Sequence, residues 1–190
     1  RLQPFIALAE RLGTFVAQMS DGGALSIGVR YYGELAEMRT DMIVNAVLTG
    51  FFKPILSSAV TMVNARSVAA ERGIEVVESR STRTRDYTSL ISVKLQTNAG
   101  ERLVEGAVIQ RKWARLVLVD GIRVEAPLQG TMVVICNTDQ PGVIGQIGTI
   151  LGAHGVNIAN FALGRDESGR AIGVVIVDET APIPDVVLEE

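Results

Sequence analysis

Hydrophobic and polar positions repeat with a helical period in some segments of this chain and with a strand period in others. Apolar residues recur every three to four positions over residues 2–19 and again from Thr40-Asp41 to Phe51, which predicts two helices. A further helix is expected to start near Leu56 or Asn64 and to stop at Gly73. Apolar alternation and short apolar runs predict strands over 24–33, 74–79, 88–97, 101–108, 113–119 and 122–126. These elements predict a first domain of the α/β or α+β class.

The second part of the chain is organised around residues 131–143. The run from Met132 to Cys136 has the length and β-branched content of a buried strand. The predicted order is strand 131–137, helix 142–154, strand 156–165, strand 171–177 and a helix beginning at Asp185. This βαββα order predicts a ferredoxin-like unit without its last strand, and the first predicted helix opens without a cap, so the chain is expected to be truncated at both ends. The connector before residue 131 contains Pro and Gly, and the predicted domains therefore cover residues 1–128 and 129–190.

Three residues with special backbone or charge properties lie at the turn between strand 131–137 and the next helix. Asp139 can cap the helix, and Pro141 suits a first helical turn because its missing N–H would be unpaired anyway. Gly142 leaves the backbone N–H groups accessible, and such a helix start is a natural site for a ligand carboxylate.

An amino acid requires donors for its carboxylate and acceptors for its ammonium group. Asp139 offers a charged acceptor, Asn157 offers a donor and an acceptor, and the amides near Gly142 and Val143 offer donors. The alternative is that Asp139 is only a cap and Asn157 only a turn residue. Their spacing around Pro141-Gly142 favours an amino-acid site.

Two stretches carry a resemblance to known families. Asn137-Thr-Asp-Gln-Pro-Gly-Val143, followed by Gly155-Val-Asn-Ile158, resembles the amino-acid-binding signature of ACT domains, which are regulatory modules of amino-acid metabolism. Residues 2–130 resemble the intervening domain of long-form D-3-phosphoglycerate dehydrogenases, through residues 3–13, Val44-Asn-Ala46, Asn64-Ala-Arg66 and 69–74. The resemblance implies an α+β fold class: a mixed α/β intervening domain followed by a ferredoxin-like (βαββαβ) ACT domain that is incomplete at its C-terminus.

The resemblance also implies a function. The chain would be the regulatory part of an NAD-dependent enzyme that oxidises 3-phosphoglycerate at the entry to serine biosynthesis, with NAD bound elsewhere in the parent enzyme. It implies feedback inhibition by L-serine at the seam between two paired ACT modules, and hence a homodimer or tetramer. The implied L-serine-binding residues are Asn137, Asp139, Pro141, Gly142, Val143 and Asn157. The same resemblance implies a site for a phosphorylated anion in the first domain, for which Arg115 and Arg123, flanking Asp120-Gly121, are the candidate ligands.

Two other functions stay open. The same pair of domains resembles part of the iron–sulfur L-serine dehydratases, which would make the chain a piece of a lyase. The second alternative is that the chain is an assembly module whose amino-acid site is vestigial.

Composition and charge narrow the possible functions. A net charge of −3, with scattered basic residues, argues against nucleic-acid binding, and no apolar run reaches the roughly 18 residues of a membrane span. Cys136, the single cysteine, is expected to pack in the core and fits a cytoplasmic protein. One histidine, His154, and one cysteine exclude a conventional zinc site, and no acid–base pair indicates catalysis.

Two further patterns have structural interpretations. The glycines in Gly142-Val-Ile-Gly145-Gln-Ile-Gly148 lie inside a helical pattern, so close packing of the helix on a sheet is expected rather than a nucleotide-binding loop. Arg80, Arg83 and Arg85 are expected to form a charged loop.

Overall fold

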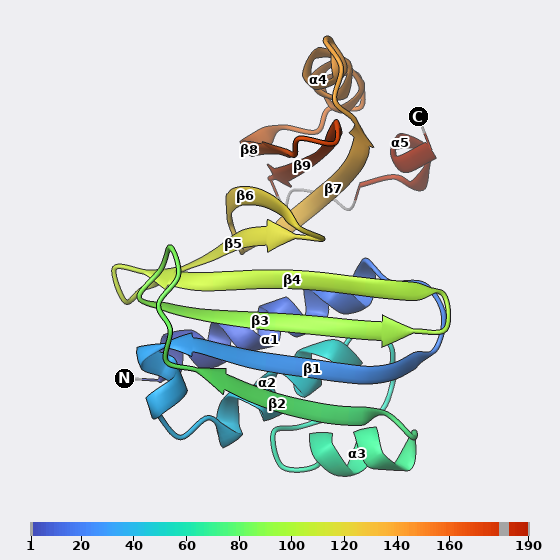
Figure 1. Ribbon diagram of the computed structural model, residues 1–190. Coiled ribbons are helices and arrows are strands. Elements are labelled where there is room, and N and C mark those ends of the chain that lie inside the picture. The colour runs from blue at the N-terminus through green and yellow to red at the C-terminus, as the bar shows by residue number, and fades with distance from the viewer. Residues whose placement is uncertain (1, 179–182, 190) are drawn as a thin grey trace. The chain divides into compact units, whose positions relative to one another are not determined.

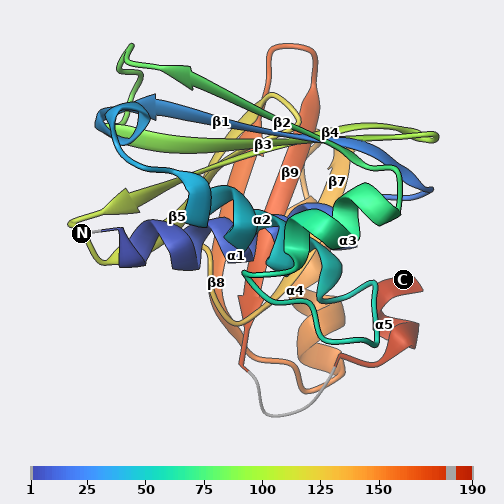
Figure 2. The ribbon, with the colours of Figure 1, turned by 90° about the horizontal axis from the view of Figure 1, so that it is seen from below.

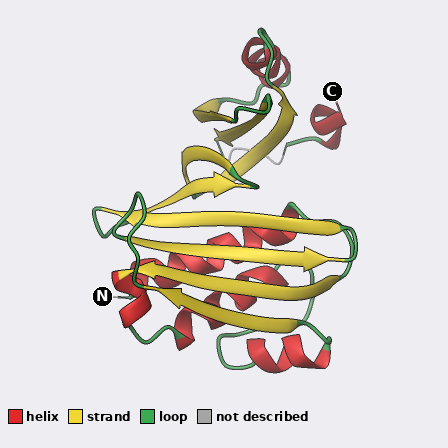
Figure 3. Ribbon diagram, in the orientation of Figure 1, coloured by secondary structure: helices red, strands yellow, loops and turns green. Residues whose placement is uncertain are grey.

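The computed structural model describes residues 2–178 and 183–189, and the chain divides into two compact units, residues 1–121 and 122–190. One mixed sheet has six strands in the order β2-β1-β3-β4-β5-β6, and a second sheet has three in the order β7-β9-β8. Helices and strands thus both contribute, and the predicted α+β fold class is confirmed (Figure 3). Within the described residues, none of the helices combines the length and apolarity needed to cross a membrane.

The first unit places its helices on one face of its strands (Figures 1 and 2). Strand β2 pairs in parallel with β1, whereas β1–β3, β3–β4 and β4–β5 are antiparallel. The elements are α1 (Gln3–Gln18), β1 (Ala24–Gly33), the 3-10 helix η1 (Glu34–Glu37), α2 (Asp41–Phe52), α3 (Ala65–Glu71), β2 (Glu75–Ser81), β3 (Ser89–Thr97), β4 (Gly100–Ile109) and β5 (Trp113–Val119); β6 (Ile122–Pro127) follows. The later of the two predicted starts for the third helix is therefore confirmed.

Two glycines let α1 and α2 approach backbone to backbone. A Cβ atom added at Gly13 would overlap the carbonyl oxygen of Val47, and one added at Gly50 would overlap that of Glu10. The Thr14 hydroxyl donates a hydrogen bond of 2.9 Å to the Gly50 carbonyl across this crossing. This close crossing keeps α1 and α2 together where they cover the sheet.

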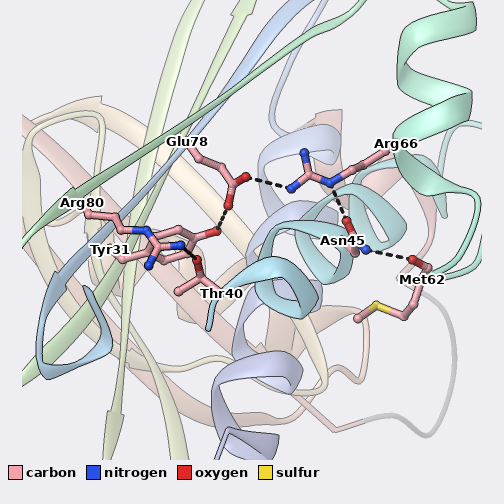
Figure 4. Close-up of polar contacts among 7 residues, drawn as sticks. All are labelled: Tyr31, Thr40, Asn45, Met62, Arg66, Glu78 and Arg80. Carbon is pink, nitrogen blue, oxygen red and sulfur yellow. Dashed lines mark hydrogen bonds and ion pairs between the residues drawn. The ribbon is translucent and has the colours of Figure 1, made fainter. Parts of the chain in front are cut away.

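A polar network on the helix side joins four elements of the first unit (Figure 4). The Tyr31 hydroxyl on β1 donates to Glu78 Oε1 on β2 at 2.9 Å, and Arg66 Nη2 on α3 donates to Glu78 Oε2 at 2.7 Å. Arg66 Nε also donates to Asn45 Oδ1 on α2 at 2.9 Å, and Asn45 Nδ2 donates to the Met62 carbonyl at 3.0 Å. Asn45 and Arg66, which carry part of the family resemblance, therefore connect α2, α3 and β2 through hydrogen bonds.

The expected charged loop is confirmed in position for Arg83 and Arg85, which lie between β2 and β3, and is wrong for Arg80. Arg80 lies in β2, where its guanidinium donates to Thr40 Oγ1 at 2.7 Å and to the Met38 carbonyl at 3.0 Å (Figure 4). Arg85 donates two hydrogen bonds, of 2.8 and 3.0 Å, to the buried carboxylate of Glu105. The partners of both arginines are distant in sequence, which is why local charge alone did not indicate these roles.

The second unit contains β7 (Thr131–Thr138), α4 (Val143–Ala153), β8 (Ile158–Arg165), β9 (Arg170–Val177) and α5 (Asp185–Glu189). The predicted βαββα order is confirmed. Leu151, Val175, Val177 and Val187 form its buried cluster, against which Val133 and Ile135 of β7 pack. The turn between β8 and β9 is organised by Asp166: hydrogen bonds from Ser168, together with contacts to Arg170, lower the pKa of its carboxyl group to about 2.

Several local predictions for the second unit are wrong. Strand β7 is only partly buried, and Cys136 is exposed rather than packed in the core. The reason is that β7 is an outer strand, whose odd-numbered residues Val133 and Ile135 face the cluster while Cys136 points to the other side. Gly145 and Gly148 do not pack closely on the sheet, because a Cβ at either position would have no atom within 4 Å among the described residues.

Candidate functional site

A cleft of about 360 Å³ lies where the turn after β7 meets the start of α4. Five of the six residues predicted to bind an amino acid line this cleft: Asn137, Asp139, Pro141, Gly142 and Val143. Gln140, Ile144, Gly145, Leu163, Arg165 and Ala171 complete its wall. The ends of three strands and the first turn of one helix therefore meet around a single space.

Asp139 is paired with an arginine from a neighbouring strand. Arg165 Nη1 donates to Asp139 Oδ2 at 3.3 Å, and the backbone N–H of Asp139 donates to the Gly169 carbonyl at 2.8 Å. The predicted capping role of Asp139 is wrong, because α4 begins at Val143 with Gly142 as its N-cap and no side-chain cap bond. Pro141 likewise precedes the helix instead of lying in its first turn. The carboxylate is therefore held beside the cleft rather than turned onto the helix.

The backbone at Gly142 has φ +92°, a left-handed conformation that an L side chain rarely adopts. The first hydrogen bond within the helix runs from the Gln146 N–H to the Gly142 carbonyl, at 3.0 Å. The N–H groups of Val143, Ile144 and Gly145 consequently have no acceptor inside the helix. These donors lie at the positive end of the helix dipole, where an anionic group is stabilised.

Asn157 is the predicted site residue that the structure does not bring to the cleft. Its Nδ2 donates to Asp178 Oδ2 at 2.6 Å, and its carbonyl accepts from the Asp178 N–H at 3.1 Å. These contacts tie the loop after α4 to the end of β9. Asn137, in contrast, lies at the cleft, where its Nδ2 donates to the Thr138 carbonyl at 2.7 Å.

Arg165 is a cleft residue that sequence reasoning missed. Strand pairing places it opposite Ala171, and Ala171 opposite Asn137, so the three form one row across β8, β9 and β7. The available signal was the hairpin turn at residues 166–169, which implies that the last residue of one strand faces the first residues of the next. The spacing of Arg165 from Asp139 along the chain carries no such information.

The two arginines predicted to hold an anion lie on different elements. Arg115 lies on β5 in the first unit, where its Nε atom is buried and has no hydrogen-bond partner among the described residues. Arg123 lies on β6, at an exposed position of the second unit. Their joint role stays a prediction. Across residues 2–178 and 183–189, no three or more His, Cys, Asp or Glu side chains lie together as metal ligands.

The family of the chain follows from comparison with known sequences. The profile of the D-3-phosphoglycerate dehydrogenase intervening domain matches residues 1–120, which is more than half of the chain. The chain belongs to this family. The profile of the ACT domain matches residues 131–189, which contain the cleft and the confirmed βαββα order.

Relatives from distant organisms match nearly all of the chain. D-3-phosphoglycerate dehydrogenase of Methanocaldococcus jannaschii is 37% identical over 96% of this chain, and that of Archaeoglobus fulgidus is 33% identical over 100%. The protein of that name from Bacillus subtilis is 33% identical over 98% of the chain. The matches cover 34%, 36% and 38% of these relatives, so the chain spans about a third of their length.

Proposed function

We propose that this chain is the regulatory part of a D-3-phosphoglycerate dehydrogenase and that the cleft at the start of α4 binds L-serine. The observation that carries the proposal is the meeting of Asp139, Arg165 and the unpaired helix amides around one space. Arg165 and the amides of α4 supply donors for the carboxylate of an amino acid, and Asp139 supplies the acceptor for its ammonium group. Asn137 lies within the same cleft and offers a polar partner for the serine hydroxyl.

The Asp139–Arg165 ion pair does not prevent ligand entry in this proposal. The Arg165 side chain is 72% exposed and that of Asp139 is 34% exposed. An ion pair so accessible to water contributes only about 0–1 kcal/mol. Separating the two groups to receive a zwitterion therefore costs little, and each gains a charged partner on the ligand.

Regulation is proposed to act through self-association of the ACT domain. In the described three-stranded sheet, the outer strand β7 has a strand partner on one side only, whereas β8 also lies against β6, and an edge such as that of β7 can pair with a second copy. L-serine at the seam would bind one arrangement of the oligomer more tightly and so inhibit the parent enzyme, because a ligand shifts an equilibrium only by its differential affinity. The parent is proposed to be a cytoplasmic, NAD-dependent enzyme acting on 3-phosphoglycerate. The boundary between the two domains of this chain is proposed to lie between residues 128 and 129.

The test is isothermal titration calorimetry of the chain with L-serine, with D-serine and glycine as control ligands. We expect stereospecific binding of L-serine and a loss of affinity of about tenfold or more in Asp139→Ala, since a charge-assisted hydrogen bond is removed. Asp21→Ala, which makes the same charge change in an exposed loop of the first unit, is the matched control. Equal affinity in Asp139→Ala and Asp21→Ala would refute the assignment of the cleft.

One alternative keeps a specific observation in its favour. Asn157 is engaged by Asp178 instead of lining the cleft, as expected for an assembly module whose amino-acid site is vestigial. Such a module would sediment as an oligomer whose size does not respond to L-serine and would give no heat with any of the three amino acids. The dehydratase alternative gains no support from the relatives named above, which are all dehydrogenases by name.

A further inference from the structure

The face of the first unit's sheet that is turned away from the helices carries a groove of about 540 Å³ over β1–β4. Along β1, Ile27, Val29 and Tyr31 are buried, whereas the alternate positions Gly28 and Arg30 line the groove. Strand register places Arg30 between Ser79 on β2 and Ser92 on β3. The same register places Gly28 opposite Lys94. Basic and hydroxyl side chains from three strands thus converge on one space.

Gly28 leaves room in the floor of this groove. A Cβ added there would have Lys94 atoms at 3.8 and 3.9 Å as its nearest neighbours, which is ordinary van der Waals contact. Close packing therefore does not require glycine at this position, and a glycine within a strand normally weakens the strand. The missing side chain instead keeps the space between Arg30 and Lys94 open.

Two of the donors that line the groove, Arg30 and Ser92, have no acceptor among the described residues, whereas Lys94 is paired with Glu101. Arg30 stacks on the ring of Tyr32 at 5.0 Å, and no described carboxylate forms an ion pair with it. Ser92 is only 7% exposed, yet its hydroxyl makes no hydrogen bond with any described residue. Ser92 lines the groove, so its hydroxyl is available to donate to an acceptor on a ligand.

The carboxylates that line the groove are already engaged. Glu105 accepts two hydrogen bonds from Arg85, and Glu101 lies 3.0 Å from Lys94 Nζ. Burial disfavours the charged form of Arg85, but the hydrogen bonds and charge of Glu105 outweigh it and raise the pKa of the guanidinium group. The acids at the groove are therefore neutralised by these pairs, and the charge of Arg30 remains for a ligand.

We propose that this groove is a binding site for a small anion, whose carboxylate or phosphate group is held by Arg30 and Ser92 with Lys94 at its side. The guanidinium fork of Arg30 can bind either group with two parallel hydrogen bonds, and the Ser92 hydroxyl adds a third donor. The site lies on β1–β4 and does not include Arg115 or Arg123. It is also independent of the proposed L-serine cleft, whose lining residues all belong to the second unit.

The test is calorimetric titration of the full chain, in a chloride-poor buffer, with inorganic phosphate in one arm and malonate in the other. We expect saturable binding of at least one probe and a loss of affinity of about tenfold or more in Arg30→Gln. Arg72→Gln makes the same charge change at an exposed position after α3 and should bind as the parent chain does. Binding of phosphate alone indicates a phosphate ester as the natural ligand, and binding of malonate alone indicates a carboxylate.

Gly28→Val provides a second and independent variant. Its side chain should fill the floor of the groove and abolish binding while the strand remains folded, which thermal unfolding will verify. The proposal is overturned if neither probe binds, or if Arg30→Gln and Gly28→Val bind both probes as tightly as Arg72→Gln. L-serine titrations of the same variants should be unchanged, so a failure here is separable from a failure of the cleft at α4.

Discussion

Tyr31 has a buried hydroxyl group beside a carboxylate. It is fully buried on the helix side of β1, and its hydroxyl donates to Glu78 Oε1 at 2.9 Å. Burial raises the pKa of Tyr31 well above its ordinary value of 10.0, and the charge and hydrogen bond of Glu78 raise it further. The folded protein therefore resists ionisation of this side chain.

This residue predicts how the first unit responds to alkali. Because the folded pKa of Tyr31 is raised, its contribution to stability is complete below pH 10.0 and is lost progressively as the pH rises above that value. We expect the free energy of unfolding of the parent chain to fall more steeply above about pH 10 than that of Tyr31→Phe. At neutral pH the variant should lose about 1 kcal/mol with the hydrogen bond. Urea unfolding across this range is the measurement, and parallel pH profiles would contradict the prediction.

Glycines in three helices differ in what surrounds them. Gly13 and Gly50 lie where α1 and α2 cross with their backbones in contact, whereas Gly145 and Gly148 of α4 face open space among the described residues. The same residue type is thus required for close approach at the crossing of α1 and α2 and not at these two positions of α4. Local sequence does not distinguish the two cases, because both sets of glycines interrupt an apolar helical pattern.

A matched pair of substitutions tests this difference. Gly50→Ala should destabilise the first unit by about 1–3 kcal/mol, because the added methyl group overlaps the Glu10 carbonyl and the helices must separate. Gly148→Ala should stabilise the second unit by about 0.5–1 kcal/mol, because alanine is the better helix former and has space. Thermal unfolding measures both changes. A destabilising Gly148→Ala would show that this face of α4 is covered in solution.

Two compact units, each with buried side chains of its own, make up the described molecule. The ligand sites proposed above follow this division, since the groove lies within the first unit and the cleft within the second. A ligand stabilises the part of a protein whose folded form binds it. At a free ligand concentration one hundred times the dissociation constant, this stabilisation is about 2.7 kcal/mol. Each ligand should therefore leave a distinct pattern of protection.

Amide hydrogen exchange can show that pattern in the whole chain. Saturating L-serine should slow exchange in residues 131–177, which hold β7, α4, β8 and β9, and leave residues 24–119 unchanged. The expected reason is that L-serine must dissociate before the second unit can open locally, whereas the first unit can open with L-serine still bound. Equal protection of both segments would instead show that the two units open together. Asp139→Ala, with serine added, should exchange as the unliganded parent chain does.

The fold was largely predictable from sequence, and the cleft was predictable in part. Strand and helix positions follow from local periodicity, and the predicted β5 range of 113–119 matches the structure. Five predicted cleft residues came together because they are neighbours in one turn. Arg165, in contrast, meets Asp139 only because β8 and β7 both pair with β9. The side chain of Asn157 turned to Asp178, a partner 21 residues away.

The amino-acid sequence by itself determined the order of elements, the α+β class and the residues of the turn at 137–143, because each depends on interactions among near neighbours. Only the tertiary structure decided that Arg165 lies beside Asp139, that Arg30 lies between Ser79 and Ser92, and that Cys136 is exposed. These outcomes depend on strand register and on which sheet face is covered. A shift of one residue in register would reverse each of them, and local periodicity does not record register between distant strands.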